Sequence, residues 1–202
     1  MTVIETEGLT KTYGESRGID DVTFSVGAGE VFGFLGPNGA GKTTTIRALL
    51  DLLHPSAGSA RIFGLDSRRE SVAIRARLGN LPGDFGYGKQ STGREALRLL
   101  ARLRGIDGLG RGEALAQRFR ADLDRPLGEL SRSNRQKVGL IRALLKRPQL
   151  VILNNTVSAF DEPSQRRLIK RIRDDLKEAA LICVTNMPAL ARSFDRVAVM
   201  QE

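Results

Sequence analysis

The sequence predicts an α/β fold with a mostly parallel sheet as its core, an N-terminal antiparallel β subdomain and a helical insertion. Three continuous apolar runs, at residues 30–35, 150–153 and 181–185, have the composition of buried parallel strands. Segments with helical spacing separate these runs, and strands separated by helices favour a parallel sheet. The 202 residues, 41% of them hydrophobic, suffice for the core of one domain that carries a sizeable insertion.

The N-terminal part is predicted to begin with strands. Residues 3–9 and 19–26 alternate apolar and polar side chains, and glycines punctuate the chain between and after them. The apolar run that follows leads into a glycine-rich turn. Residues 44–55 then place apolar side chains three or four positions apart, which predicts a helix that Pro55 ends. A further strand is expected within residues 54–66.

The middle of the chain has few strand signals and several helical ones. Helical spacing recurs at residues 98–105, 114–123 and 138–148. We therefore expect residues 84–147 to form a helical subdomain, and residues 1–83 and 148–202 to form the α/β core with its N-terminal β subdomain. Within this last part a charged helix is expected at 163–179 and a final strand at 197–202.

Composition excludes several classes of protein. A single cysteine, Cys183, excludes a disulfide scaffold, and its apolar strand context indicates a buried core thiol. The only histidine is His54, so any mechanism that needs a histidine elsewhere is excluded. No window reaches the roughly 18 consecutive apolar residues of a membrane span. The N-terminus is mixed and partly acidic, which is unlike a signal peptide and predicts a cytoplasmic location.

The net charge of +9 favours acidic partners such as nucleotides, nucleic acid or an anionic membrane face. Many of the arginines fall on helical segments, where they are typical of a solvated face. Because no dense Lys/Arg tract with interleaved aromatic residues occurs, we expect no nucleic-acid partner.

Residues 36–43 fit the phosphate-loop pattern G-x-x-x-x-G-K-[ST] at every position, between a predicted strand and a predicted helix. Glycines let the backbone curl so that its N–H groups face the phosphates. Lys42 is expected to reach the β- and γ-phosphates, and Thr43 to offer its hydroxyl to Mg²⁺. The residues predicted to hold the nucleotide phosphates are Asn38, Gly39, Ala40, Gly41, Lys42, Thr43 and Thr44.

With this loop in place, the chain resembles the ATP-binding subunits of ABC transporters over nearly its whole length. The family's motifs follow in order: LTKTYG with Tyr13, GPNGAGKTT, the signature region Leu130–Lys137, LVILNNTVSAFD at the Walker B strand and D-loop, and LICVTN at the switch strand. The LPGDFG segment and the wording around the signature are most similar to bacterial ABC-2-type exporter subunits.

The resemblance implies a P-loop NTPase fold of the ABC ATPase type, with ATP and Mg²⁺ as cofactors. It implies that Tyr13 stacks on adenine, that Thr43 is the Mg²⁺ ligand, and that Ser131 faces the γ-phosphate of a second subunit in a head-to-tail dimer. A homodimer and a heterodimer both remain open. It further implies a separate transmembrane permease, and therefore a peripheral position on the cytoplasmic face of the inner membrane. Ser131 is equally interpretable as a plain helix N-cap.

Three positions depart from the family pattern where the chemistry takes place. Asn154 replaces the aspartate that holds Mg²⁺, Asn155 replaces the glutamate that polarises water, and Asn186 replaces the switch histidine. An amide keeps the shape of a carboxyl group but loses its charge and basicity. Losing a positioned base typically costs about 10²- to 10⁴-fold in rate. Gly83 stands at the usual Q-loop glutamine, which some exporter subunits also lack.

We therefore expect a weakened Mg²⁺ site, weak or absent hydrolysis and no intact catalytic residue, so that enzyme status stays open although the family is one of ATPases. The leading interpretation is the ATP-binding subunit of an ABC exporter. The alternative is a non-hydrolysing module that acts as the regulatory half of a heterodimer. An ABC-type ATPase acting on DNA or ribosomes is suggested only by the charge, and those proteins usually carry two ATP-binding halves.

Overall fold

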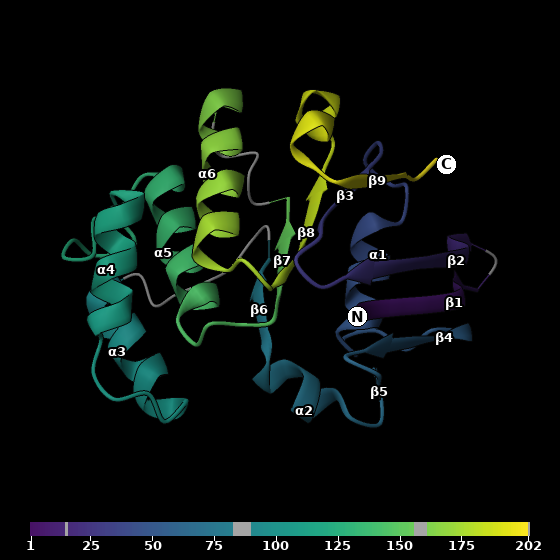
Figure 1. Ribbon diagram of the computed structural model, residues 1–202, viewed down its shortest axis with the longest axis horizontal. Coiled ribbons are helices and arrows are strands. Elements are labelled where there is room, and N and C mark those ends of the chain that lie inside the picture. The colour runs from purple at the N-terminus through teal and green to yellow at the C-terminus, as the bar shows by residue number, and fades with distance from the viewer. Residues whose placement is uncertain (15, 83–89, 156–160, 202) are drawn as a thin grey trace.

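Two sheets of different type organise the protein (Figure 1). The computed structural model describes residues 1–14, 16–82, 90–155 and 161–201. A five-stranded parallel sheet has the order β6-β7-β8-β3-β9, and a four-stranded antiparallel sheet has the order β2-β1-β4-β5. The predicted α/β class, with its mostly parallel core and N-terminal antiparallel strands, is confirmed.

The parallel sheet consists of β3 (Val31–Leu35), β6 (Leu78–Leu81), β7 (Leu150–Asn154), β8 (Ala180–Thr185) and β9 (Arg196–Val199). Every residue of β3 and β8 is buried, as expected for strands covered on both faces. Because all five strands run the same way, their carboxyl ends meet at one edge of the sheet.

Alternate residues of the central strands supply two separate cores. Phe32, Ile152 and Ile182 face a core shared with the first helix and the antiparallel sheet. Val151 and Leu181 face the other core, which they share with the helices of the 93–144 region and with the charged helix. This alternation follows from the period of two of a β-strand.

The antiparallel sheet consists of β1 (Thr2–Tyr13), β2 (Ser16–Gly27), β4 (Ala57–Ile62) and β5 (Leu65–Asp66). Strands β1 and β2 are longer than the alternation alone predicts. The register of their pairing shifts several times, so the hydrophobic pattern is interrupted although the ladder continues.

The helices are α1 (Lys42–Leu49), α2 (Ser71–Ala76), α3 (Gly93–Leu103), α4 (Gly110–Phe119), α5 (Arg132–Leu144) and α6 (Glu162–Asp175), with a 3₁₀ segment at Pro188–Ser193. Figure 1 shows α3, α4 and α5 grouped on the side of the parallel sheet away from the antiparallel strands. The helical insertion is thus present, and the boundaries 84 and 147 stay a prediction. No helix in the described part of the chain is long and apolar enough to cross a membrane.

Several helices end earlier than the sequence predicts: α5 ends at Leu144 instead of at Pro148, and α6 ends at Asp175 instead of at residue 179. The largest difference is in α1. Helix α1 ends at Leu49, well before Pro55. Asp51 adopts a left-handed conformation with φ 53°, and the Leu52 amide donates to the Arg47 carbonyl oxygen at 2.9 Å. The backbone therefore turns out of the helix although the apolar spacing continues, because helical spacing does not register a left-handed turn.

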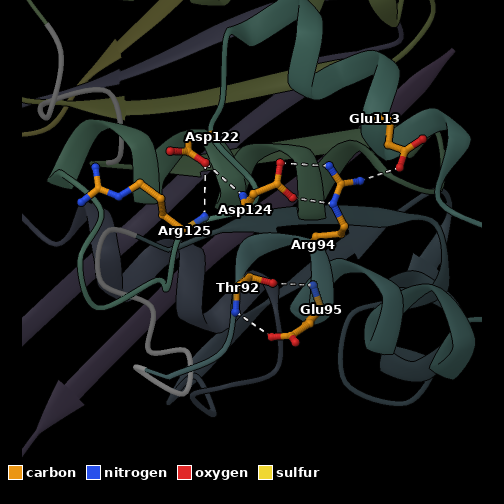
Figure 2. Close-up of polar contacts among 7 residues, drawn as sticks. All are labelled: Thr92, Arg94, Glu95, Glu113, Asp122, Asp124 and Arg125. Atoms are coloured by element: carbon orange, nitrogen blue, oxygen red, sulfur yellow. Dashed lines mark hydrogen bonds and ion pairs between the residues drawn. The ribbon is translucent and has the colours of Figure 1, made fainter.

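A polar network holds the grouped helices together (Figure 2). Arg94 on α3 donates to Asp124 at 2.7 and 3.2 Å and to Glu113 on α4 at 2.6 Å. Its guanidinium holds the pKa of Asp124 below the ordinary value. The backbone of Asp122, in the same loop, accepts from the Asn134 side chain of α5 at 2.9 Å and donates to it at 3.0 Å. These bonds tie the loop before α5 to α3 and α5, and Arg94 links it in turn to α4.

The first testable prediction concerns Cys183 on β8, whose side chain is completely buried. Burial raises the pKa of this thiol to about 12, so almost no thiolate exists at pH 8. We expect an aromatic disulfide reagent to leave the folded chain unlabelled and to label it fully in guanidinium chloride. A Ser59→Cys variant, with its added thiol at an exposed position of β4, should label at once. Rapid labelling of the unchanged folded chain would contradict a buried core thiol.

Candidate phosphate-loop site

The loop predicted to cradle phosphates connects the carboxyl end of β3 to the first residue of α1. Gly39 and Gly41 have φ values of 95° and 82°, which favour glycine. A Cβ on Gly41 would lie 2.4 Å from Cγ2 of Ile19 and 2.6 Å from the carbonyl oxygen of Gly18. The loop therefore lies directly against β2, and Gly41 is required both for its backbone conformation and for this close approach.

Lys42 occupies the first position of α1 and is only 5% exposed. Its Nζ donates to the carbonyl oxygens of Gly36 and Pro37, at 2.7 and 2.5 Å, and burial lowers the pKa of the lysine. The first N–H groups of a helix have no intrahelical acceptor, and the helix dipole favours an anion there. The ammonium and these amides therefore meet at one place, as phosphate binding requires.

Thr43 faces a small hollow that the Walker B position also lines. This hollow of about 250 Å³ is lined by the polar residues Thr43, Arg47, Asn80, Asn154 and Asn155, together with apolar side chains. Asn154 ends β7, next to β8, and Asn155 follows it with φ 53°. The structure thus brings together the predicted metal ligand and two of the three substituted positions.

The Thr43 hydroxyl and the amide oxygens of Asn154 and Asn155 are of the donor type that suits Mg²⁺, whereas the Arg47 guanidinium adds a positive charge to the same lining. The Oδ1 atom of Asn154 is buried and accepts no hydrogen bond from the described residues. Thr43 and Asn154 thus fit a Mg²⁺ ion by atom type, but they carry no negative charge. In the ranges that the structure describes, no cluster of three or more Asp, Glu, His or Cys side chains is placed to hold a metal.

The remaining predicted site residues lie on separate elements. Tyr13 ends β1 and is 48% exposed, with the Lys11 ammonium 5.4 Å from its ring centre. Ser131 is exposed and caps α5, because its side chain accepts from the Asn134 amide at 3.2 Å. Asn186 is exposed directly after β8. The cap interpretation of Ser131 is confirmed, and its contact with a nucleotide stays a prediction.

Asp161 is not a substitute base at the strand end. It caps α6, accepting from the Ser164 amide, and hydrogen bonds from Ser164 lower the pKa of Asp161. A carboxylate held ionised by capping bonds is a weak base. Gly83 and residues 156–160 of the Walker B and D-loop motif lie outside the described residues.

Sequence reasoning missed Arg47 and Asn80 in the hollow, and Gly18 beside the loop. Arg47 had a usable signal, since it lies four residues after Thr43 and so on the same helix face. Asn80 had none, because its place depends on the pairing of β6 with β7, which puts it opposite Ile152.

The fold and the loop together define a nucleotide-binding protein of the P-loop class. The family model described as ABC transporter matches residues 19–158, and the chain belongs to this family as an ATP-binding subunit. The resemblance seen in the sequence is therefore confirmed, together with the fold it implies. Members of this family bind ATP, typically with Mg²⁺.

Two relatives illustrate the similarity. The bacitracin transport ATP-binding protein BcrA of Bacillus licheniformis is 32% identical over all of this chain and 67% of its own length. The daunorubicin/doxorubicin resistance ATP-binding protein DrrA of Streptomyces peucetius is 33% identical over 98% of this chain and 62% of its own length. The chain thus spans about two thirds of these relatives.

Two solved structures match over nearly the whole chain. An ATP-binding subunit of an ABC transporter has a TM-score of 0.88 at 28% identity, over 99% of this chain and 86% of its own. A bacterial ABC transporter cassette solved as a dimer has a TM-score of 0.85 at 21% identity, over 98% and 94%, and so shows the fold alone.

The second prediction tests the cap at Ser131. Replacing an N-cap serine by alanine removes the acceptor for a first-turn amide and typically costs about 1 kcal/mol. We expect Ser131→Ala to lower the free energy of unfolding by that amount in a urea titration. The control variant Ser59→Ala, at an exposed position of β4, should change it by less than about 0.5 kcal/mol. Equal stability of Ser131→Ala and the unchanged chain would contradict the capping role.

Proposed function

We propose that this chain is the ATP-binding subunit of an ABC exporter that binds ATP but hydrolyses it very slowly or not at all. The observation that carries the proposal is the hollow beside the phosphate loop, which Thr43, Asn154 and Asn155 line and to which no carboxylate contributes among the described residues. The loop supplies the backbone N–H groups and the Lys42 ammonium that bind phosphates. The end of β7 lacks the carboxylates that hydrolysis requires.

Binding is supported by three groups of different character. The first-turn amides of α1 and the Lys42 ammonium provide donors for phosphate oxygens. Thr43 and Asn154 would hold Mg²⁺ through neutral oxygens, and the ion supplies the positive charge that neutralises the phosphates. Tyr13, half exposed at the end of β1, offers a ring face for the base.

Slow hydrolysis follows from the missing carboxylates. A water molecule that attacks the γ-phosphate needs an acceptor for its proton, and an amide at residue 155 is not basic. Without a carboxylate at residue 154 the Mg²⁺ site is also weaker. These losses affect one chemical step, so their effects on the rate need not multiply.

The proposed partners are a second ATP-binding subunit and a separate permease at the inner membrane, with the chain bound to its cytoplasmic face. The exposed N-terminus of α5 at Ser131 suits a site completed by a second subunit. Arg98, Leu99, Arg102 and Leu103 form an exposed face of α3 that suits a protein contact. Export as the direction rests on relatives named for drug resistance and for Nod factor export.

A second candidate function is the regulatory half of a heterodimer. It is favoured by the contrast between the signature motif and the Walker B motif of this chain. This chain keeps the signature serine, Ser131, exposed as the N-cap of α5, while amides replace the carboxylates at its own Walker B strand end. In a heterodimer it would complete the site of a partner that carries the carboxylates. Phosphate release that appears only when such a partner is added would distinguish this candidate from a homodimer.

The third prediction concerns binding. Changing Lys42 to alanine removes a charged donor for phosphate oxygens, and such bonds contribute about 1.5–3 kcal/mol, or roughly tenfold or more in affinity. We expect calorimetric titration with ATP to show at least this loss. The control is Lys170→Ala, an exposed lysine on α6, which should bind as the unchanged chain does. Equal affinities for the Lys42→Ala variant and the unchanged chain would refute the assignment of the loop.

The fourth prediction concerns turnover. At saturating ATP and Mg²⁺ the unchanged chain should release phosphate at the background rate. The triple variant Asn154→Asp, Asn155→Glu, Asn186→His should release it faster, because it regains a metal carboxylate, a base and a switch side chain. Asn154→Asp alone should give little turnover.

The control for this measurement is Lys42→Ala in the triple variant, which should return the rate to background and so exclude a contaminating ATPase. Lysine-dependent turnover by the unchanged chain of order 1 s⁻¹ or more would show that the site is not disabled.

A further inference from the structure

We propose that Gly18 is a positioning residue for base recognition, because it sets the spacing between the Tyr13 ring and the phosphate loop. The inference rests on the proposed function, in which Tyr13 stacks on the base of a bound nucleoside triphosphate. Gly18 itself offers no side chain to a ligand. It acts through its contacts with the Tyr13 ring and with the phosphate loop at Gly41.

The first step is the pairing of β1 with β2 near their shared turn. Lys11 is opposite Ile19 and Thr12 is opposite Arg17, so Gly18 is the extra residue of a β-bulge. A bulge bends its strand and changes the direction in which neighbouring side chains point. The bulge lies next to Tyr13, the last residue of β1.

The second step is the contact of Gly18 with the Tyr13 ring. A Cβ on Gly18 would lie 2.7 Å from Cε2 and 3.1 Å from Cδ2 of that ring, and 2.9 Å from the Lys11 carbonyl oxygen. Real Cβ atoms do not approach so closely. The Tyr13 ring rests against the Gly18 backbone, at a distance that a glycine alone permits.

The third step is the contact of Gly18 with the loop. The Gly18 carbonyl oxygen lies 2.6 Å from where a Cβ of Gly41 would be. Gly41 directly precedes Lys42, so this contact lies beside the loop residues that are expected to bind the phosphates. The bulge therefore touches the Tyr13 ring on one side and, together with the Ile19 side chain, the loop on the other. The distance from the nucleotide base to the phosphates depends on where the Gly18 backbone lies.

A methyl group at residue 18 would meet the Tyr13 ring, which is half exposed at the end of β1, and the Lys11 carbonyl oxygen, which belongs to the strand backbone. The closer contact is with the ring, and the carbonyl contact at 2.9 Å needs a small shift of the strand. We therefore expect Gly18→Ala to displace the ring much more than the loop. An aromatic stacking contact is worth about 0.5–1.5 kcal/mol, which is roughly a two- to twelvefold change in affinity.

The experiment compares ATP with tripolyphosphate, which has no base, by calorimetry on the full chain. Gly18→Ala should weaken ATP binding about three- to tenfold and leave tripolyphosphate binding unchanged. Tyr13→Ala should show the same loss, and the double variant should lose no more than either single variant. Gly110→Ala is the matched control, since its Cβ would enter open space at the start of α4.

Unchanged ATP affinity of Gly18→Ala, an equal loss for tripolyphosphate, or additive losses in the double variant would each overturn the inference. If Gly18→Ala unfolds, the double variant decides: removing the ring should raise the melting temperature above that of Gly18→Ala, although the Lys11 carbonyl contact remains, and no gain would refute the ring contact. If the unchanged chain binds ATP but the Gly18 and Tyr13 variants do not show the expected losses, the proposed function stands without this inference. No ATP binding by the unchanged chain would overturn both.

Discussion

The hydrogen-bonded position of β3 is the constraint on which the site depends. All five of its buried residues pair with β8 on one side, and four of them pair with β9 on the other, which fixes the position of the strand. The phosphate loop begins where this ladder ends, and Asn154 ends the strand two places away in the same sheet. Parallel strands bring their carboxyl ends to one edge, where ligands of open α/β sheets bind. The loop and the Walker B position meet for this reason.

The chemical character of that edge is set by amides in place of carboxylates. The loop needs only backbone N–H groups, Lys42 and Thr43 to hold phosphates, and all of these are in place. Hydrolysis needs a base beside the attacking water, and the hollow next to Thr43 offers Asn154 and Asn155. ATP binding and ATP hydrolysis thus depend on different residues, and this chain retains those for binding. The proposed function is the consequence of that separation.

Much of the fold followed from local patterns, whereas several site contacts did not. The buried strands and the loop have strong signals, because apolar runs and the glycine spacing are read directly from neighbouring residues. The early end of α1 depends on Asp51 in a left-handed turn, which helical spacing does not reveal. The role of Gly18 depends on a bulge between β1 and β2, and the place of Asn80 on the register of β6. Such pairings join distant residues, so no local pattern contains them.

The most direct test of the account is the fate of nucleotide bound in a single turnover. The chain, in excess over radiolabelled ATP and with Mg²⁺ present, is quenched at intervals, and the bound nucleotide is separated by chromatography. Since the loop is intact and the carboxylates are absent, we expect binding that Lys42→Ala abolishes, with the label recovered as ATP over many minutes. Conversion of the bound label to ADP within seconds, lost in Lys42→Ala, would contradict it.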